Sequence, residues 1–200
     1  MSYSSTSWTT DGLTQAGSSG TTTMGGITLY AYFGAGHGMT HSFSVNTHVA
    51  LPFMGYPQST SLTDEPELGT STDPATSLTT ADDAHQMAAM FAPCMWYVPD
   101  NITIDAIYSI EGADDATGDT TRMHLMSYTF TSGSTSCLTS GTLLGHNDDV
   151  TNAGNEQVYL STWTVDSASV AAGKVILATF RSDSVNSDYS LNVIVKYHLS

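Results

Sequence analysis

Three histidines in the stretch GAGHGMTHSFSVNTH make metal binding the first chemistry to consider. On a strand, His37 and His41 would share a face but lie about 13 Å apart at the usual rise per residue, and His48 would point to the opposite face. A single ion cannot be held across that separation, and the same stretch contains no Cys or carboxylate to complete a ligand set. We therefore expect polar loop and edge histidines here, and no metal site.

Glycines in the same stretch raise the question of a cofactor. Gly34, Gly36 and Gly38 are spaced closely enough to suggest a dinucleotide-binding loop. Such a loop opens a helix directly after its glycines, because the helix N-terminus holds the pyrophosphate. Alternating apolar residues follow instead, which indicates another strand. We expect no bound cofactor.

Two stretches rich in Asp could bind cations or act as acids and bases. EGADDATGDTT carries Asp114, Asp115 and Asp119, but EF-hand spacing and its closing Glu are absent. A hairpin connection rich in Asp and Gly explains this composition equally well, and a calcium-binding loop stays open as the alternative. In GHNDDVTNAGNE, the adjacent Asp148 and Asp149 are predicted to be solvated charges, not a catalytic pair across a cleft.

Covalent catalysis has no motif in this sequence. No Gly-x-Ser-x-Gly segment is present, and nothing in the sequence pairs a particular His with Cys94 or Cys137. Two cysteines in a chain of 200 residues do not form a disulfide framework. We expect buried, reduced thiols, with a single bridge as the alternative, and we expect no enzyme activity.

Aromatic side chains offer one more kind of chemistry, because exposed ring faces stack on the apolar faces of sugars. We single out Trp96 and Trp163 as possible ligand-stacking residues, with Tyr30, Tyr32 and Tyr97 in the same group. The alternative is that these rings pack in the core and in subunit interfaces. We favour packing and keep sugar binding as a second hypothesis.

The charge balance excludes two classes of partner. The chain has 19 acidic and 4 basic residues, for a formal net charge of -15, and the basic residues are scattered. They cannot neutralise a phosphate backbone or an anionic membrane surface, so we expect neither nucleic acid nor membrane as a partner. No apolar run reaches transmembrane length, and the first residues, MSYSSTSWTTDG, do not predict a signal peptide.

The elements that would position these residues are strands. Apolar residues alternate in NITIDAIYSIEG, with Ile102, Ile104, Ala106, Tyr108 and Ile110 on one predicted face. Similar runs follow about every ten residues, separated by turn clusters: TRMHLMSYTFT, EQVYLSTWTVD, GKVILATFRSD and YSLNVIVKYHL. The last two are predicted to be neighbours in one sheet, joined by a Ser/Asp/Asn turn. This spacing predicts an all-β fold, an antiparallel β-sandwich or jelly roll.

Three segments depart from this pattern. Residues 1–25 are polar and punctuated by Gly, which predicts an extended N-terminal arm ahead of a sandwich domain at 26–200. Residues 55–80 contain three Pro and little periodicity, which predicts a long surface loop. The segment ADDAHQMAAMFAP fits either a short helix capped by Asp82, with Ala84, Met87, Ala88 and Phe91 on one face, or a strand at residues 86–92. We favour the strand because strands surround it.

The C-terminal half resembles a known group of proteins. FAPCMWYVPDNITIDAIYSIEG, SASVAAGKVILATFRSD and YSLNVIVKYHL together resemble the jelly-roll-like β-sandwich domain of tailed-phage virion proteins, namely head-fibre, decoration and tail-fibre proteins. The resemblance covers roughly residues 90–200. It departs from the family where Ala172-Gly173-Lys174 stands in place of a Gly-Asp turn. It implies a module that forms trimers and has no catalytic residues.

These observations predict a non-enzymatic virion structural protein, either a capsid decoration (cement) protein or a short head or tail fibre, assembled in the host cytoplasm. Its expected partners are copies of itself, as a homotrimer, other virion proteins such as the major capsid protein, and possible surface glycans. The alternative is a carbohydrate-binding or receptor-binding β-sandwich module.

Overall fold

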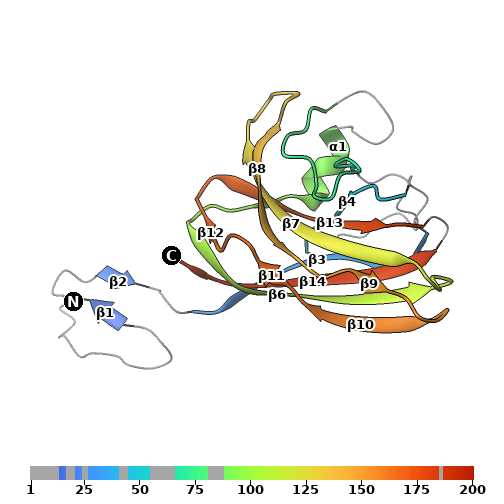
Figure 1. The fold of residues 1–200 in the computed structure, drawn as a ribbon. Coiled ribbons are helices and arrows are strands. Elements are labelled where there is room, and N and C mark those ends of the chain that lie inside the picture. The colour runs from blue at the N-terminus through green and yellow to red at the C-terminus, as the bar shows by residue number, and fades with distance from the viewer. Residues whose placement is uncertain are drawn as a thin grey trace.

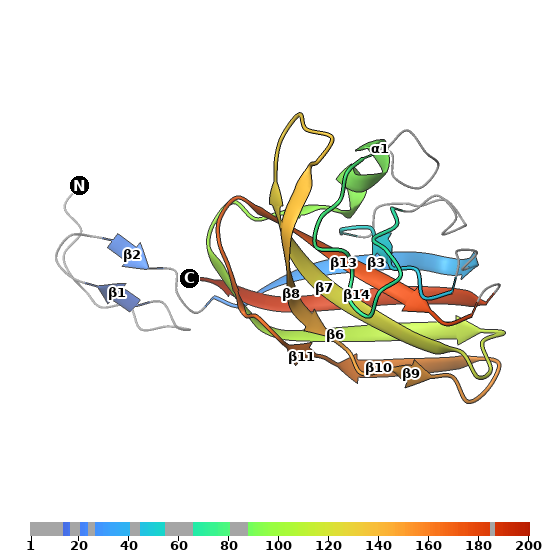
Figure 2. The ribbon, with the colours of Figure 1, turned by 45° about the horizontal axis from the view of Figure 1, so that its top comes forward.

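The computed structural model describes residues 14–16, 21–23, 27–40, 45–54, 66–80, 88–184 and 187–200. Within the segment predicted as an arm, β1 (Thr14–Ala16) and β2 (Thr21–Thr23) pair antiparallel as a two-stranded sheet. Figures 1 and 2 show these two strands apart from the rest of the fold. The other residues before position 27 lie outside the described part of the chain.

Two antiparallel sheets pack together as a β-sandwich, which confirms the predicted fold class (Figure 1). Sheet I has the order β10 (Gln157–Thr162), β6 (Ile102–Asp114), β14 (Asp188–Leu199) and β3 (Leu29–Thr40), with β12 (Ser169–Val170) also paired to β6. Sheet II has the order β11 (Thr164–Val165), β8 (Leu138–His146), β7 (Thr120–Phe130), β13 (Lys174–Ser182) and β4 (Val49–Leu51). Two further short strands join sheet II: β5 (Trp96–Tyr97) pairs with β13, and β9 (Val150–Thr151) pairs with β7.

The main strands follow the path of a jelly roll. In chain order β3, β4, β6 and β7 alternate between the sheets, β7 and β8 form a hairpin in sheet II, and β10, β13 and β14 alternate again. The last strand, β14, lies between β3 and β6 in the middle of sheet I. Two expected hairpins are therefore wrong, because β13 and β14 lie in opposite sheets, and so do β6 and β7. The turn residues between each pair carry the chain across the sandwich.

The main core lies between the sheets and is built from alternate residues of each strand. The alternation of inward and outward side chains along β6 changes at a bulge. At this bulge the register against β14 shifts between Ile104 and Ala106. A bulge adds one residue, so the face that points inward changes from even to odd numbers. Ile102 and Ile104 are buried as predicted, but the predicted buried face is wrong beyond them, since Ile110 is 39% exposed. In place of Ile110, the neighbouring Glu111 faces the core.

A second apolar cluster covers the outer face of sheet II. Leu68 and Leu78, from the segment predicted as a surface loop, are buried against this face. Bridges tie the segment to the sheet, from Glu67 to Val49 and from Leu78 to Leu138. The described part of this loop, residues 66–80, is thus a strap whose apolar side chains are anchored on the sheet while residues such as Ser71 and Thr72 remain exposed. Residues 55–65 lie outside the described part.

A short helical stretch covers the rest of this outer face. Residues 88–94 form α1 (Ala88–Phe91) and a single 3-10 turn, η2 (Ala92–Cys94), so the predicted strand at 86–92 is wrong. Phe91 and Cys94 point into the second cluster, and Pro93 suits the 3-10 turn better than a paired strand. Asp82 lies outside the described residues. Within the described ranges, no helix is long and apolar enough to cross a membrane.

Candidate functional site

The outer face of sheet I carries large apolar side chains that no described element covers. They come from three of its strands and are between 39% and 76% exposed: Tyr30, Tyr32, Ile110, Val158 and Leu160. Cross-strand register places them in adjoining rows, since Leu160 pairs with Ile110 and Tyr32 pairs with Ile194. Contiguous apolar surface of this kind marks an interaction site more often than single exposed residues do.

This outer face is nearly free of charge in a strongly acidic chain. From residue 157 to residue 165 the sequence has no ionisable acid or base other than Tyr159. The central rows of the face likewise hold no carboxylate, and the basic residue on its strands is Lys196. The carboxylates of the sheet lie towards the ends of the strands, as at Asp105 and Asp114. The middle of the face can therefore approach an apolar partner without burying an acid.

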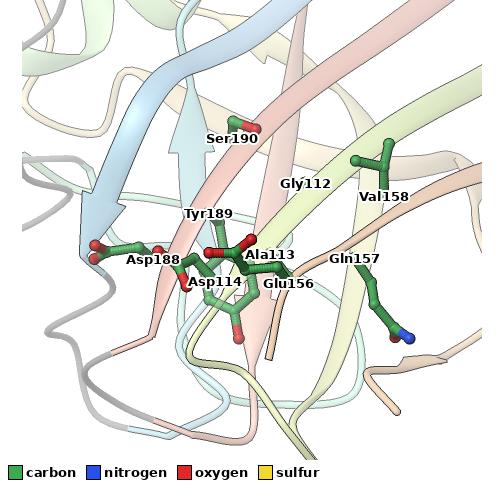
Figure 3. Close-up of a pocket in the computed structure, with 9 residues that line it drawn as sticks. All are labelled: Gly112, Ala113, Asp114, Glu156, Gln157, Val158, Asp188, Tyr189 and Ser190. Atoms are coloured by element: carbon green, nitrogen blue, oxygen red, sulfur yellow. The ribbon is translucent and has the colours of Figure 1, made fainter. Parts of the chain in front are cut away.

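At one end of sheet I the surface forms a hollow of about 670 Å³ (Figure 3). Its lining includes the carboxylates of Asp114, Glu156 and Asp188. Gly112 leaves the space open, because a Cβ there would lie 2.5 Å from Ser190 Oγ. In the part of the chain that the structure describes, no group of three or more His, Cys, Asp or Glu side chains is arranged to hold a metal ion. The hollow is an acidic surface feature without a catalytic or metal-binding constellation.

A buried carboxyl group lies inside the sandwich near the same end. Glu111 is 1% exposed, and Thr121 Oγ1 donates to its carboxyl oxygens at 2.8 Å. Burial raises the pKa of Glu111 to about 7, and hydrogen bonds from Thr121 and Asn152 oppose part of that shift. In a second group of polar side chains, the Asp119 carboxylate accepts hydrogen bonds from Ser187 and Tyr189. These contacts tie together the β6–β7 connection and the start of β14.

Three histidines form a row under the strap that covers sheet II. The rings of His48 and His124 meet edge to face with centroids 4.8 Å apart, and His146 stacks on His124 at 6.3 Å. His48 Nε2 bonds to the Ser71 carbonyl oxygen of the strap at 2.9 Å, and His146 Nδ1 lies 2.7 Å from a carboxylate oxygen of Asp166. The rings fill space between sheet and strap and are not arranged around an ion.

Burial disfavours the charged form of two of these rings. Burial lowers the pKa of His48 to about 4, although the hydrogen bond to the Ser71 carbonyl oxygen partly raises this pKa. The pKa of His124 is also well below its usual value, first through burial and then through the neighbouring His48 and Arg122. Asp73 Oδ1 lies 3.6 Å from His124 Nε2, too far for a hydrogen bond, and its side chain is largely exposed.

Trp96 and Trp163, the residues singled out for sugar stacking, lie in the main core. They are 7% and 5% exposed, so neither offers a ring face to solvent. Trp96 stacks on Phe53 with centroids 5.7 Å apart, and Trp163 Nε1 donates to Ser109 Oγ at 2.9 Å. Both rings contribute packing. The exposed aromatic residues of the predicted group are Tyr30, Tyr32 and Tyr97.

The Asp and His residues that the sequence analysis also considered lie in separate parts of the fold. Asp149 forms an exposed ion pair with Arg122 at 3.4 Å, and the neighbouring Asp148 is exposed. The side chain of His37 and the whole of His41 lie outside the described part of the chain. Sequence reasoning grouped His48 with these two by proximity and missed its contact with His124, 76 residues further along the chain. Sequence reasoning also missed the buried Glu111. It did not single out the exposed side chains of Val158 and Leu160 on β10, although the alternation of apolar and polar residues in EQVYLSTWTVD was a signal that could have indicated them.

The two cysteines lie in the second apolar cluster and form no disulfide with each other. Cys94 Sγ donates to the Met90 carbonyl oxygen at 3.6 Å, and burial raises the pKa of the Cys137 thiol. We expect a thiol reagent to label them slowly in the folded protein, because the thiolate is the reactive species. Unfolding in denaturant without reductant should expose two labelled thiols per chain, counted by mass spectrometry. No labelling under those conditions would instead establish a disulfide between them.

Comparison with known proteins adds no family assignment. No family model matches the chain, and no curated protein matches it.

Proposed function

We propose that the protein is a non-enzymatic structural subunit of a tailed-virus particle, a capsid decoration (cement) protein or a short fibre, that acts by assembling with copies of itself and with other virion proteins such as the major capsid protein. Its site of action is the virion, assembled in the host cytoplasm. The form that the resemblance favours is a homotrimer.

The observation that carries the proposal is the apolar outer face of sheet I, whose central rows hold no carboxylate. Two chains of net charge -15 repel each other over most of their surfaces, and a stable contact between them needs a surface without carboxylates. The rows containing Tyr32, Ile110 and Leu160 supply one. The jelly-roll fold is compatible with this role, since both viral capsid domains and lectins use it, but a fold alone does not decide function.

Light scattering on the purified protein at micromolar concentration and physiological salt tests the self-assembly. We expect a mass of several chains, three or a multiple of three if the trimer forms, with no loss of mass at higher salt, because burial of apolar surface drives the contact and salt screens the repulsion between the acidic chains. Mass spectrometry of purified virus particles from an infection that encodes the chain then tests the location. A monomer in solution that is also missing from particles would reject the proposal.

Carbohydrate binding stays as the second candidate because Tyr30 and Tyr32 are 50% and 41% exposed on the same face. Their rings could stack on sugars, whereas the buried indoles cannot. A monomeric protein that binds a glycan array, and loses the signal on Tyr32→Ala, would favour this function over assembly.

A further inference from the structure

Strand β10 is an open edge of sheet I. It pairs with β6 on one side over its whole length, and among the described residues no strand pairs with its other side. Its side chains alternate between half-buried and exposed, and Val158 and Leu160 are the most exposed large apolar residues of the described chain, at 76% and 74%. An edge of this kind offers unpaired backbone groups to another strand.

The hydrogen-bonding pattern shows which backbone groups of β10 are free. The Trp163 N–H donates to the Ile107 carbonyl oxygen at 3.0 Å, and the register of the pair continues without a shift from there along β10. Backbone groups alternate in direction along an antiparallel strand, so the odd-numbered residues point towards β6. The N–H and C=O groups of Val158, Leu160 and Thr162 therefore point outward from the sheet.

The usual protections of an edge strand are missing here. Natural edges carry Lys, Pro, an inward charge or a bulge that prevents pairing with another chain. The sequence of β10 is QVYLST, with none of those residues, and its register shows no bulge. Solvent-exposed Val and Leu on such a strand are a liability unless a partner covers them.

We propose that β10 pairs antiparallel with β10 of a second copy of this chain, which joins two copies of sheet I edge to edge. This inference rests on the proposed self-assembly and names its contact. The pairing is two-fold, so each strand donates and accepts the same set of backbone hydrogen bonds. Val158 and Leu160 of both copies then meet on one face of the joined sheet and extend its apolar rows.

The uncharged sequence of β10 lets a second copy of this acidic chain approach the edge, and the flanking acids favour the antiparallel direction. The nearest acid before the strand is Glu156 and the next one after it is Asp166, with no charged residue between. In an antiparallel pair centred on Tyr159 or Leu160, Glu156 of one copy lies opposite an uncharged Thr of the other. A parallel pair would place the two Glu156 side chains together in a molecule that is already strongly acidic.

The contact joins chains in pairs, so a trimer requires a different surface. We expect light scattering of the wild-type protein to show an even number of chains, which is two from this contact alone and six if homotrimers also form through another surface. Leu160→Lys should raise the dissociation constant of the paired state by about tenfold or more, because the added ammonium group must be desolvated in the contact. Leu160→Pro should weaken it too, by removing an outward N–H while the bonds to β6 remain. Unchanged far-UV circular dichroism and thermal melting would show that both variants are folded.

Val45→Lys is the matched control. Val45 is 50% exposed and does not lie in sheet I, and the substitution changes the net charge by the same amount. It should leave the mass unchanged. Loss of pairing in Leu160→Lys cannot come from greater repulsion between chains, because an added Lys reduces the net negative charge.

The outcomes separate the two proposals. A wild-type monomer would overturn both self-assembly and the β10 contact. A wild-type oligomer of three chains, or any oligomer that keeps its mass in both Leu160 variants, would overturn the β10 contact alone and leave assembly through another surface. Equal dissociation by Val45→Lys would also overturn it, by showing a general effect of charge.

Discussion

Replacing Glu111 by Gln should raise the free energy of unfolding by about 3 kcal/mol at pH 8, and by less than about 1 kcal/mol at pH 5. The carboxyl group is 1% exposed inside the sandwich, and its pKa rises from 4.5 in the unfolded chain to about 7 in the folded one. Each pKa unit corresponds to about 1.4 kcal/mol, which sets the size of the effect.

The sign follows from the protons bound in each state. Below pH 4.5 the carboxyl of Glu111 is protonated in both states, and its contribution to stability is fully present. As the pH rises from 4.5 to about 7, the unfolded chain releases this proton while the folded chain keeps it, so the folded state loses stability. A Gln side chain has no proton to release, is of similar size, and its oxygen can still accept the hydrogen bond from Thr121.

Urea unfolding at pH 5 and pH 8 measures this difference. Glu156→Gln is the matched control, since it removes an exposed carboxylate from the same end of the molecule and should change the free energy of unfolding by less than about 0.5 kcal/mol at either pH. Equal destabilisation of Glu111→Gln at both pH values would show that the folded state needs an ionised carboxylate at this position.

Lowering the pH from 7 to 5 should destabilise the protein through the buried histidines, and His124→Gln should remove about 2 kcal/mol of that loss. His48 and His124 are 0% exposed and their pKa values lie below 6.5 in the folded chain. Above pH 6.5 both rings are neutral in both states. As the pH falls below 6.5, the unfolded chain binds protons that the folded chain excludes.

The surroundings of the row explain why protonation is so unfavourable. Arg122 and Arg181 add positive charge near His124, and the half-exposed Asp73 does not bond to its ring. Among the residues that the structure describes, His124 Nδ1 and Nε2 have no hydrogen-bond partner, so a charged ring there would be buried without compensation from these residues. The strap around Ser71 is the element that we expect to detach first in acid, because it encloses the rings.

Each variant is compared with itself at pH 7 and pH 5, so any cost of the altered packing cancels. His198→Gln is the control, since His198 is partly exposed, lies in sheet I and pairs with Asp105 at 2.9 Å, away from the row. An acid response that is identical in wild type and His124→Gln would refute the assignment. Together with Glu111, the histidines place the maximum of stability near neutral pH, where the proton uptake of the unfolded histidines and the proton retained by folded Glu111 balance.

The sequence by itself determined the fold class. Alternation in segments such as NITIDAIYSIEG and GKVILATFRSD depends only on which side chains avoid water in an extended chain, so it predicts strands without knowledge of their neighbours. The regular spacing of the strands indicated the β-sandwich for the same reason. The partners of each strand were not determined, because a polar connection of a few residues can close a hairpin or cross between sheets.

The candidate surfaces depended on tertiary structure. The bulge after Ile104 changes the face of β6 and so puts Ile110 outside and Glu111 inside, against the simple alternation. A bulge is fixed by pairing with β14, which follows some 80 residues later, and no local pattern encodes it. Likewise, Trp96 is buried because it packs against Phe53 and Tyr197 in the core, although its strand β5 pairs with β13 alone among the described strands, and Leu160 is exposed because it lies on the outer face of an edge strand. Local side-chain chemistry sets the strands, and long-range pairing decides which of their faces remain for a partner.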